Sequence, residues 1–393
     1  MKPPHPIHPF PARMAPHVAL KAIESLTPGS TVLDPMMGSG TVVRLAAEAG
    51  HRAIGRDVDP LAVLMARVWT SPIDPQQLRV AARELVDEAR ELSPECINLP
   101  WIDDDAETSA FSVYWFAEEQ RRCLRQLSAC LRWRDDVIGD ALRIALSRII
   151  ITKDRGASLA RDVSHSRPHK VAQTNAYRVF EGFLESVHRL ARRLEEEPPC
   201  GWVDVARGDA RATGIDAQTV DAVITSPPYL NAIDYIRGHR LALIWFGCRL
   251  RDLRAIRRCS IGAERAPDQS ADPELLDEIF RILKVPPDFP QRERRILARY
   301  VTDLDAMLRE VHRVLKCGGI AVFVIGNSSI KGSFVRNSRI IAHILRRLGF
   351  NHVSHFSRPI LPSRRYLPPP AQAGMSNLEH RMRREVVLTY VRL

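Results

Sequence analysis

Two short segments far apart in the chain hold the residue types best suited to chemistry. The first is Val32–Thr41, in which Asp34 is followed by glycines at positions 38 and 40. The second is Thr225–Tyr229, which reads Thr-Ser-Pro-Pro-Tyr. A hydrophobic run that predicts a strand leads into each segment, so both are expected at carboxyl ends of strands, where open α/β sheets bind their ligands.

The first segment has the features of an anion-binding turn. Glycines 38 and 40 permit a tight turn and a close approach to the backbone, and the helix expected from Thr41 directs free amides at an anion. A carboxylate fits better than a pyrophosphate, because neither Gly-Lys-Ser/Thr nor a full Gly-x-Gly-x-x-Gly is present. Asp57 ends the next predicted strand, where a carboxylate accepts hydrogen bonds from ribose hydroxyls. These features favour an adenosine that carries a carboxylate; a glycine turn used only for packing is the alternative.

The second segment is suited to holding an amine. Pro227 and Pro228 stiffen the turn and direct the preceding carbonyls outward, so that the Ser226 hydroxyl and a backbone oxygen can accept hydrogen bonds from an exocyclic amine. Tyr229 offers an aromatic face for a base flipped out of a helix. The alternative interpretation is a proline-rich turn after a strand, with Tyr229 as ordinary packing.

The elements around these segments alternate between strand and helix, then become helical. This pattern predicts one doubly wound α/β sheet formed by residues 1–73 and 201–393, with a helical insertion at 74–200. Strands are expected at 31–34, 52–57, 202–206, 220–225, 320–325, 351–356 and 385–391. Helices are expected at 41–49, 76–92, 115–131, 138–150, 179–194, 300–315 and 340–348. The Pro-rich stretch 359–370 predicts a loop between the last two strands.

Several motifs resemble those of DNA amino-methyltransferases. Residues 34–41, Asp-Pro-Met-Met-Gly-Ser-Gly-Thr, are similar to that family's Asp-Pro-Phe-x-Gly-Ser-Gly-Thr loop, with Met36 where an aromatic residue is usual. Residues 8–13 resemble the segment placed before that loop, 55–60 resemble the Gly-x-Asp-x-Asn-Pro turn, and 208–210 resemble the Gly-Asp-Ala motif. The motifs occur in the family's order and, with Ser226-Pro-Pro-Tyr229, bracket most of the chain outside the insertion.

This resemblance implies a class I, Rossmann-like methyltransferase that uses S-adenosylmethionine. In the family, Asp57 corresponds to the ribose-binding acid and Asp209 to the residue that meets the adenine amine. The cofactor-binding residues implied are Phe10, Ala12, Arg13, Asp34, Pro35, Gly38, Ser39, Gly40, Thr41, Asp57 and Asp209. The catalytic residues implied are Ser226, Pro227, Pro228 and Tyr229.

Ser226 favours one target base over another. In the family, serine at this position is commoner in enzymes that methylate N4 of cytosine, and aspartate is commoner in enzymes that methylate N6 of adenine. We therefore expect a cytosine-N4 DNA methyltransferase, with adenine N6 as the near alternative and an RNA base as another. A DNA-binding protein on a degenerate methyltransferase scaffold is disfavoured because the cofactor and catalytic motifs are both intact.

The basic composition favours a nucleic-acid partner. The chain of 393 residues carries 57 Lys and Arg against 46 Asp and Glu, a net charge of +11, and we expect it to bind double-stranded DNA. Two arginine-rich segments are candidates for sequence recognition, one in the insertion 74–200 and the other at 234–299. Asn231, Asp234 and Tyr235 are candidates either to line the base pocket or to brace the catalytic loop. Arg364 and Arg365 are candidates to touch the DNA backbone.

Other features limit the environment of the protein. No apolar run is long enough to span a membrane, and the first residues lack the hydrophobic core of a signal peptide. The seven cysteines show no Cys-x-x-Cys spacing, so neither a metal site nor a disulfide framework is expected. We expect a bacterial, cytoplasmic, nucleoid-associated enzyme, with a cognate restriction endonuclease as a possible partner; the sequence leaves the oligomeric state open.

Overall fold

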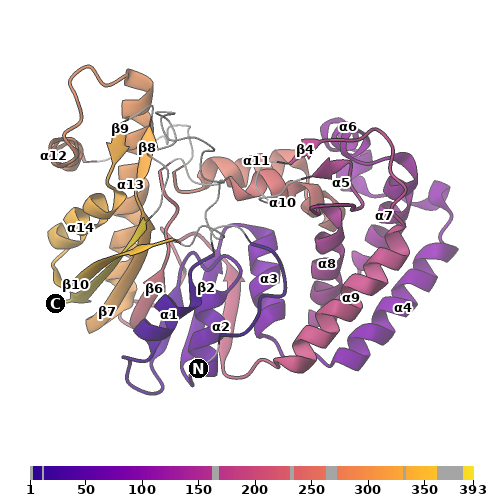
Figure 1. Ribbon diagram of the computed structural model, residues 1–393, viewed down its shortest axis with the longest axis horizontal. Coiled ribbons are helices and arrows are strands. Elements are labelled where there is room, and N and C mark those ends of the chain that lie inside the picture. The colour runs from indigo at the N-terminus through magenta and orange to yellow at the C-terminus, as the bar shows by residue number, and fades with distance from the viewer. Residues whose placement is uncertain are drawn as a thin grey trace.

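A seven-stranded sheet forms the centre of the protein (Figure 1). The computed structural model describes residues 3–10, 13–161, 168–230, 234–262, 272–330, 333–360 and 384–393. The strands are β1 (Thr31–Asp34), β2 (Arg52–Asp57), β5 (Val203–Arg207), β6 (Val220–Thr225), β7 (Leu315–Gly326), β10 (Phe350–Pro359) and β11 (Arg384–Arg392). Their order across the sheet is β10-β11-β7-β6-β1-β2-β5. β11 runs antiparallel to both neighbours, and the other pairings are parallel.

This order confirms the predicted doubly wound sheet. From β1 the chain moves outward through β2 to β5, and then returns to place β6 on the other side of β1. The direction of winding therefore reverses between β1 and β6, which is where sheets of this kind bind ligands. β1 ends at Asp34 and β6 ends at Thr225, so both chemically promising segments begin at this point. All seven strands predicted from the sequence are present.

Helices cover both faces of the sheet and form two cores. One core contains α1 (Pro16–Ile23) and α2 (Thr41–Glu48), and the other contains α12 (Pro273–Leu283), α13 (Gln291–Val314) and α14 (Asn337–Arg347). Successive strand residues point to opposite faces. Accordingly, Val32 of β1 lies in the first core and Leu33 in the second, each no more than 1% exposed.

A third core belongs to a layer of helices beside the sheet, on the right in Figure 1. The predicted insertion supplies α4 (Pro75–Glu91), α5 (Pro100–Asp103), α6 (Ala106–Trp115), α7 (Glu118–Leu131), α8 (Val137–Ile150) and α9 (Val179–Glu196). These pack with α3 (Pro60–Thr70), α10 (Tyr235–Leu243) and α11 (Leu250–Cys259). We call these nine helices, α3 to α11, the helical body. The Trp101 indole donates to the Ile244 carbonyl at 2.7 Å and so ties the insertion to the segment after the catalytic motif.

The remaining described elements are small. Short helices lie at η1 (Pro94–Cys96) and η2 (Ile244–Phe246). Two short hairpins pair β3 (Ala160–Arg161) with β4 (His169–Lys170), and β8 (Ser328–Ile330) with β9 (Ser333–Val335). No helix in the described part of the chain combines the length and apolarity needed to cross a membrane.

Two helix predictions need correction. The helix predicted at 115–131 begins three residues later, at Glu118, and Trp115 is the last residue of α6. The helices are separated because Phe116 has extended dihedral angles (φ −132°, ψ 132°), and its ring, 1% exposed, lies edge-on against Trp245. α7 then begins with Glu118 and Glu119, whose charges favour a helix amino terminus. The helix predicted at 300–315 begins nine residues earlier, at Gln291, after Pro290 as its N-cap. Most of the predicted loop 359–370 lies outside the described residues.

Candidate active site

A hydrogen bond joins the ends of the two central strands. The Thr225 hydroxyl, at the end of β6, donates to Oδ1 of Asp34, at the end of β1, over 2.7 Å. The same oxygen accepts the Met36 amide at 3.1 Å. Asp34 is 3% exposed, and burial raises the pKa of its carboxyl to about 7. The first and second segments are therefore held together at one place in the sheet.

The turn after Asp34 requires both of its predicted glycines. Gly38 and Gly40 have φ of +52° and +86°, in the left-handed region that favours glycine. A Cβ at Gly38 would lie 2.8 Å from the Phe10 ring, and one at Gly40 would lie 2.8 Å from the Ala66 Cβ. The turn is thus packed too closely for any side chain at either position.

The amino terminus of α2 has unused hydrogen-bonding capacity. Gly40 is the N-cap and supplies no side-chain acceptor to the first amides of the helix. The Ser39 and Thr41 hydroxyls are buried, and neither has a hydrogen-bond partner among the described residues. Buried polar groups without partners are uncommon and indicate a missing ligand or water. This end of α2 fits the carboxylate of S-adenosylmethionine, as the sequence predicts.

Asp57 stands at the end of β2, next to this turn. Its Oδ2 accepts the Gly38 amide and its Oδ1 accepts the Asp59 amide, both at 2.9 Å. Burial, and next to it the charge of Asp59, raise the pKa of Asp57 to about 6. Each carboxylate oxygen retains acceptor capacity, which is what two ribose hydroxyls need.

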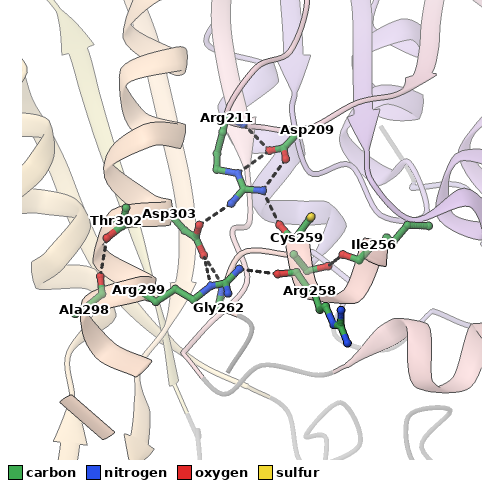
Figure 2. Close-up of polar contacts among 11 residues, drawn as sticks. Asp209, Arg211, Ile256, Arg258, Cys259, Gly262, Ala298, Arg299, Thr302 and Asp303 are labelled. Carbon is green, nitrogen blue, oxygen red and sulfur yellow. Dashed lines mark hydrogen bonds and ion pairs between the residues drawn. The ribbon is translucent and has the colours of Figure 1, made fainter. Parts of the chain in front are cut away.

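Asp209 is engaged by a neighbouring arginine (Figure 2). The Arg211 guanidinium donates from Nε to Oδ1 of Asp209 at 3.0 Å and from Nη2 to Oδ2 at 2.7 Å. It also donates to Asp303 at 2.6 Å and to the Cys259 carbonyl at 2.5 Å. The predicted contact of Asp209 with an adenine amine would use the remaining lone pairs of this carboxylate, and it stays a prediction.

The same network reaches α11 and α13. The Asp303 side chain, 3% exposed, also accepts the Gly262 amide at 3.3 Å and lies 3.5 Å from Nε of Arg299. Arg299 in turn donates to the Arg258 carbonyl at 2.6 Å. Two arginines thereby hold the last carbonyls of α11, and both are paired with one buried aspartate (Figure 2).

The Ser-Pro-Pro-Tyr segment is held from behind by its own core. The Ser226 hydroxyl donates to the Val324 carbonyl at 2.9 Å, and the Tyr300 hydroxyl donates to the Pro228 carbonyl at 3.0 Å. No backbone amide within the described ranges donates to the Pro227 carbonyl. Tyr229 is half-buried against the core that contains Tyr300, and burial raises the pKa of its hydroxyl. The two acceptors proposed for an amine are therefore the lone pairs of Ser226 Oγ and the Pro227 oxygen.

The amino-terminal segment reaches this site through Phe10. Its ring stacks on Tyr235 of α10, with centroids 4.9 Å apart and an interplanar angle of 12°. Tyr235 therefore contacts the amino-terminal segment, and both roles expected for it, lining the base pocket or bracing the catalytic loop, stay predictions. The Arg13 guanidinium lies over the Trp69 ring at 5.8 Å. Ala12, a predicted cofactor contact, lies outside the described residues.

Sequence reasoning missed a buried pair near the cofactor turn. Asp59 and His239 are 5% and 7% exposed, and Oδ2 of Asp59 lies 2.5 Å from Nδ1 of His239. Asp59 also caps α3 by accepting the Leu61 amide at 2.9 Å. Asp before Pro60 is a recognisable helix-start signal. No sequence signal identifies His239 as its partner, because the two lie 180 positions apart.

The two arginine-rich candidates for DNA recognition lie partly in one body. α10 and α11 pack against the insertion, while α12 and α13 pack against the sheet. Several α11 arginines form ion pairs, such as Arg257 with Asp234 at 2.7 Å and Arg254 with Glu107 of the insertion. Asp234 also caps α10. Asn231, Arg364 and Arg365 lie outside the described residues.

Comparison with known proteins identifies relatives over nearly the whole chain. The Type II methyltransferase M.MvaI of Kocuria varians is 25% identical over 399 residues, which cover 92% of this chain and 85% of that protein. M.MjaII of Methanocaldococcus jannaschii, also a Type II methyltransferase, is 21% identical, covering 91% of this chain and 76% of its own. The Type II methyltransferase M.BsoBI of Geobacillus stearothermophilus is 23% identical, covering 84% and 75%.

These relatives confirm the resemblance that the motifs indicated, to S-adenosylmethionine-dependent DNA methyltransferases. No protein-family model matches the chain. Among solved structures, an S-adenosylmethionine-dependent methyltransferase from Methanosarcina mazei aligns with 97% of this chain and 99% of its own at 9% identity and a TM-score of 0.35. That likeness is weak, so the order and directions of the strands carry the fold assignment.

Proposed function

We propose that this chain, an S-adenosylmethionine-dependent DNA methyltransferase, methylates the exocyclic N4 amine of cytosine within a specific sequence of double-stranded DNA. The observation that carries the choice of base is Ser226 at the first position of the Ser-Pro-Pro-Tyr segment. In the resembling family this residue is commoner in cytosine-N4 enzymes. The bond from Thr225 to Asp34 supports the role of the segment, because Thr225 directly precedes Ser226 and Asp34 directly precedes the proposed cofactor turn.

The proposed cofactor site combines residues from four parts of the chain. The α2 amino terminus with Ser39 and Thr41 would hold the carboxylate, and Asp57 the ribose. The full proposed set is Phe10, Ala12, Arg13, Asp34, Pro35, Gly38, Ser39, Gly40, Thr41, Asp57 and Asp209. S-adenosylmethionine supplies a methyl group already activated by its sulfonium.

The proposed catalytic residues work by alignment. The Ser226 hydroxyl donates its hydrogen bond to the Val324 carbonyl, so Oγ is left with lone pairs that can accept. With the Pro227 carbonyl it would hold both amine hydrogens and turn the nitrogen lone pair toward the methyl group. Pro228 fixes the turn through the bond from Tyr300, and Tyr229 would contact the flipped base.

The helical body is the proposed DNA-recognition region. It joins the insertion 74–200 to α10 and α11, which follow the catalytic segment directly. The excess of positive charge supports binding to the phosphate backbone. Because its relatives are Type II methyltransferases, we also propose that the chain protects DNA from a cognate restriction endonuclease.

The test is the identity of the methylated nucleoside. The protein is incubated with S-adenosylmethionine and unmethylated genomic DNA, the DNA is digested completely, and the nucleosides are separated by mass. We expect N4-methyldeoxycytidine. N6-methyldeoxyadenosine would overturn the choice of base, but the assignment as a DNA methyltransferase would stand. Methyl transfer to RNA in place of duplex DNA would overturn the proposed substrate.

A further inference from the structure

The amino-terminal segment that carries Phe10 is anchored to the helical body. We call residues 5–10 the strap. At its start, Oε2 of Glu197, just after α9, accepts the His5 amide, and Oε1 of Glu197 contacts His5 Nδ1, both at 2.7 Å. Glu197 lies at the end of the insertion, far in sequence from the cofactor turn.

The middle of the strap is fixed by two adjacent residues of α8. A 2.8 Å hydrogen bond joins Ser147 Oγ to His8 Nε2, and the Arg148 guanidinium donates to the Ile7 carbonyl. The Ile7 side chain is 2% exposed and lies within the core of the helical body. Three strap residues are therefore held by the insertion.

The end of the strap meets the candidate cofactor turn. Phe10 lies so close to Gly38 that a Cβ there would be 2.8 Å from the ring. On its other side Phe10 stacks on Tyr235. Gly38 donates to Asp57, the proposed ribose ligand. A shift of the strap along α8 would therefore move Phe10 against Gly38 and change the shape of the candidate cofactor turn.

We propose that Ser147 and Arg148 are positioning residues that set the affinity for S-adenosylmethionine by holding the strap over the cofactor turn. This inference rests on the proposed cofactor site. It gives the insertion a role besides DNA recognition: the insertion orders a segment that the cofactor would otherwise have to order on binding. Pre-ordering of this kind raises affinity because less conformational entropy is lost in the complex.

The contacts of Ser147 separate this role from simple packing. Its hydroxyl bonds both the strap and the Ile144 carbonyl of its own helix. Ser186 of α9 is a matched control, because it is similarly buried and bonds the Ala145 carbonyl at 2.8 Å within the helical body. Replacing either serine by alanine removes one buried hydroxyl from the helical body, but of the hydrogen bonds described for the two only that of Ser147 reaches the strap.

The test compares Ser147→Ala with Ser186→Ala in the full chain. S-adenosylhomocysteine is the probe, with its Kd measured by calorimetry and the melting temperature measured without ligand. We expect Ser147→Ala to raise Kd about tenfold, the effect of one lost buried hydrogen bond, and Ser186→Ala to leave it within about twofold. In methyl transfer, the KM for S-adenosylmethionine should rise while kcat and the KM for DNA stay unchanged.

A second pair of variants uses Arg148. Arg148→Met should weaken cofactor binding in the same way, and Arg148→Lys should recover part of it, because an ammonium can still donate to the Ile7 carbonyl. Equal effects of Ser147→Ala and Ser186→Ala on Kd would overturn the strap proposal alone. A wild-type chain that does not bind S-adenosylhomocysteine would overturn the cofactor site and the strap proposal together.

Discussion

The Thr225 hydroxyl donates to the Asp34 carboxylate over 2.7 Å, although the two residues are 191 positions apart. The bond crosses from β6 to β1, the two strands between which the winding of the sheet reverses. It stabilises a carboxylate that is 3% exposed. Because the candidate cofactor turn follows Asp34 and Ser226 follows Thr225, the bond ties together the two segments that carry the candidate site.

Removing this bond should lower both the stability of the fold and the rate of methyl transfer. Thr225→Val keeps the shape of the side chain but leaves Asp34 Oδ1 with only the Met36 amide. We expect a loss of about 1–3 kcal/mol in the free energy of unfolding, measured by urea denaturation, and a lower rate of methyl transfer. Thr225→Ser retains the hydroxyl and should stay close to wild type. Equal behaviour of the two variants would show that the bond has no role.

Cofactor binding should depend on pH through Asp57. Its carboxyl has a pKa raised to about 6 by burial and by Asp59. The ionised form is needed to accept bonds from both ribose hydroxyls, so affinity should be full above this pKa and fall as pH drops through it. Below pH 6 we expect Kd for S-adenosylhomocysteine to rise by up to about tenfold per pH unit.

The control for this pH dependence is Asp57→Asn. The carboxamide still offers one oxygen but does not titrate, so the variant should bind more weakly at neutral pH and show no step near pH 6. Burial raises the pKa of Asp34 to about 7, and the charge of Asp57 adds to this shift, so Asp34 should still titrate in the variant, at a slightly lower pH. A step near pH 6 that persisted in Asp57→Asn would assign it to another group.

Much of the fold was predictable because strands and glycine turns leave local signals. The hydrophobic runs predicted all seven strands of the central sheet. The helices α1, α3, α5, α6, α10, α11 and α12 were not predicted. The break at Phe116 depends on its contact with Trp245, more than a hundred positions away. A tertiary contact of that kind can override local helix propensity, and the spacing of apolar residues around Phe116 does not reveal it.

The candidate site was predictable only one residue at a time. Asp34, Gly38, Gly40 and Asp57 follow strands and could be selected from the sequence, whereas their partners could not. Two side-chain pairs near the site show this: His239 bonds Asp59, and Ser147 bonds His8, each across a long separation in the chain. Such bonds depend on how the helical body packs beside the sheet. The spacing of hydrophobic residues predicts helices and strands but not how they pack together.

Ser226 provides the sharpest test of the proposed chemistry. Ser226→Ala removes one of the two proposed acceptors, so the amine would no longer be aligned with the methyl group. We expect a fall of about 100-fold in kcat with Kd for S-adenosylhomocysteine within about twofold, measured with tritiated cofactor and duplex DNA. Ser25→Ala, on an exposed residue that bonds only the Ala22 carbonyl, should have no effect. A fully active Ser226→Ala enzyme would remove this residue from catalysis.

Arg211 should link cofactor affinity to the stability of α11. Its guanidinium pairs with Asp209 and the buried Asp303 and also binds the Cys259 carbonyl. A lysine has a single ammonium that cannot reproduce this fork of contacts. Arg211→Lys should therefore lower the free energy of unfolding by about 1–3 kcal/mol and raise Kd for S-adenosylhomocysteine several-fold, because Asp209 is no longer oriented toward the adenine.

The matched control for Arg211 is Arg309→Lys. Arg309 pairs with Asp305 at 2.8 Å on the same helix as Asp303, but its side chain is 58% exposed, and exposed pairs of this kind contribute about 0–1 kcal/mol. Arg309→Lys should therefore leave both the Kd for S-adenosylhomocysteine and the free energy of unfolding nearly unchanged. If Arg211→Lys lowered stability while Kd stayed at the wild-type value, the network would serve only to hold α11 against α13. That result would show that cofactor binding does not depend on how Arg211 orients Asp209. The predicted contact between Asp209 and adenine would then lose its support.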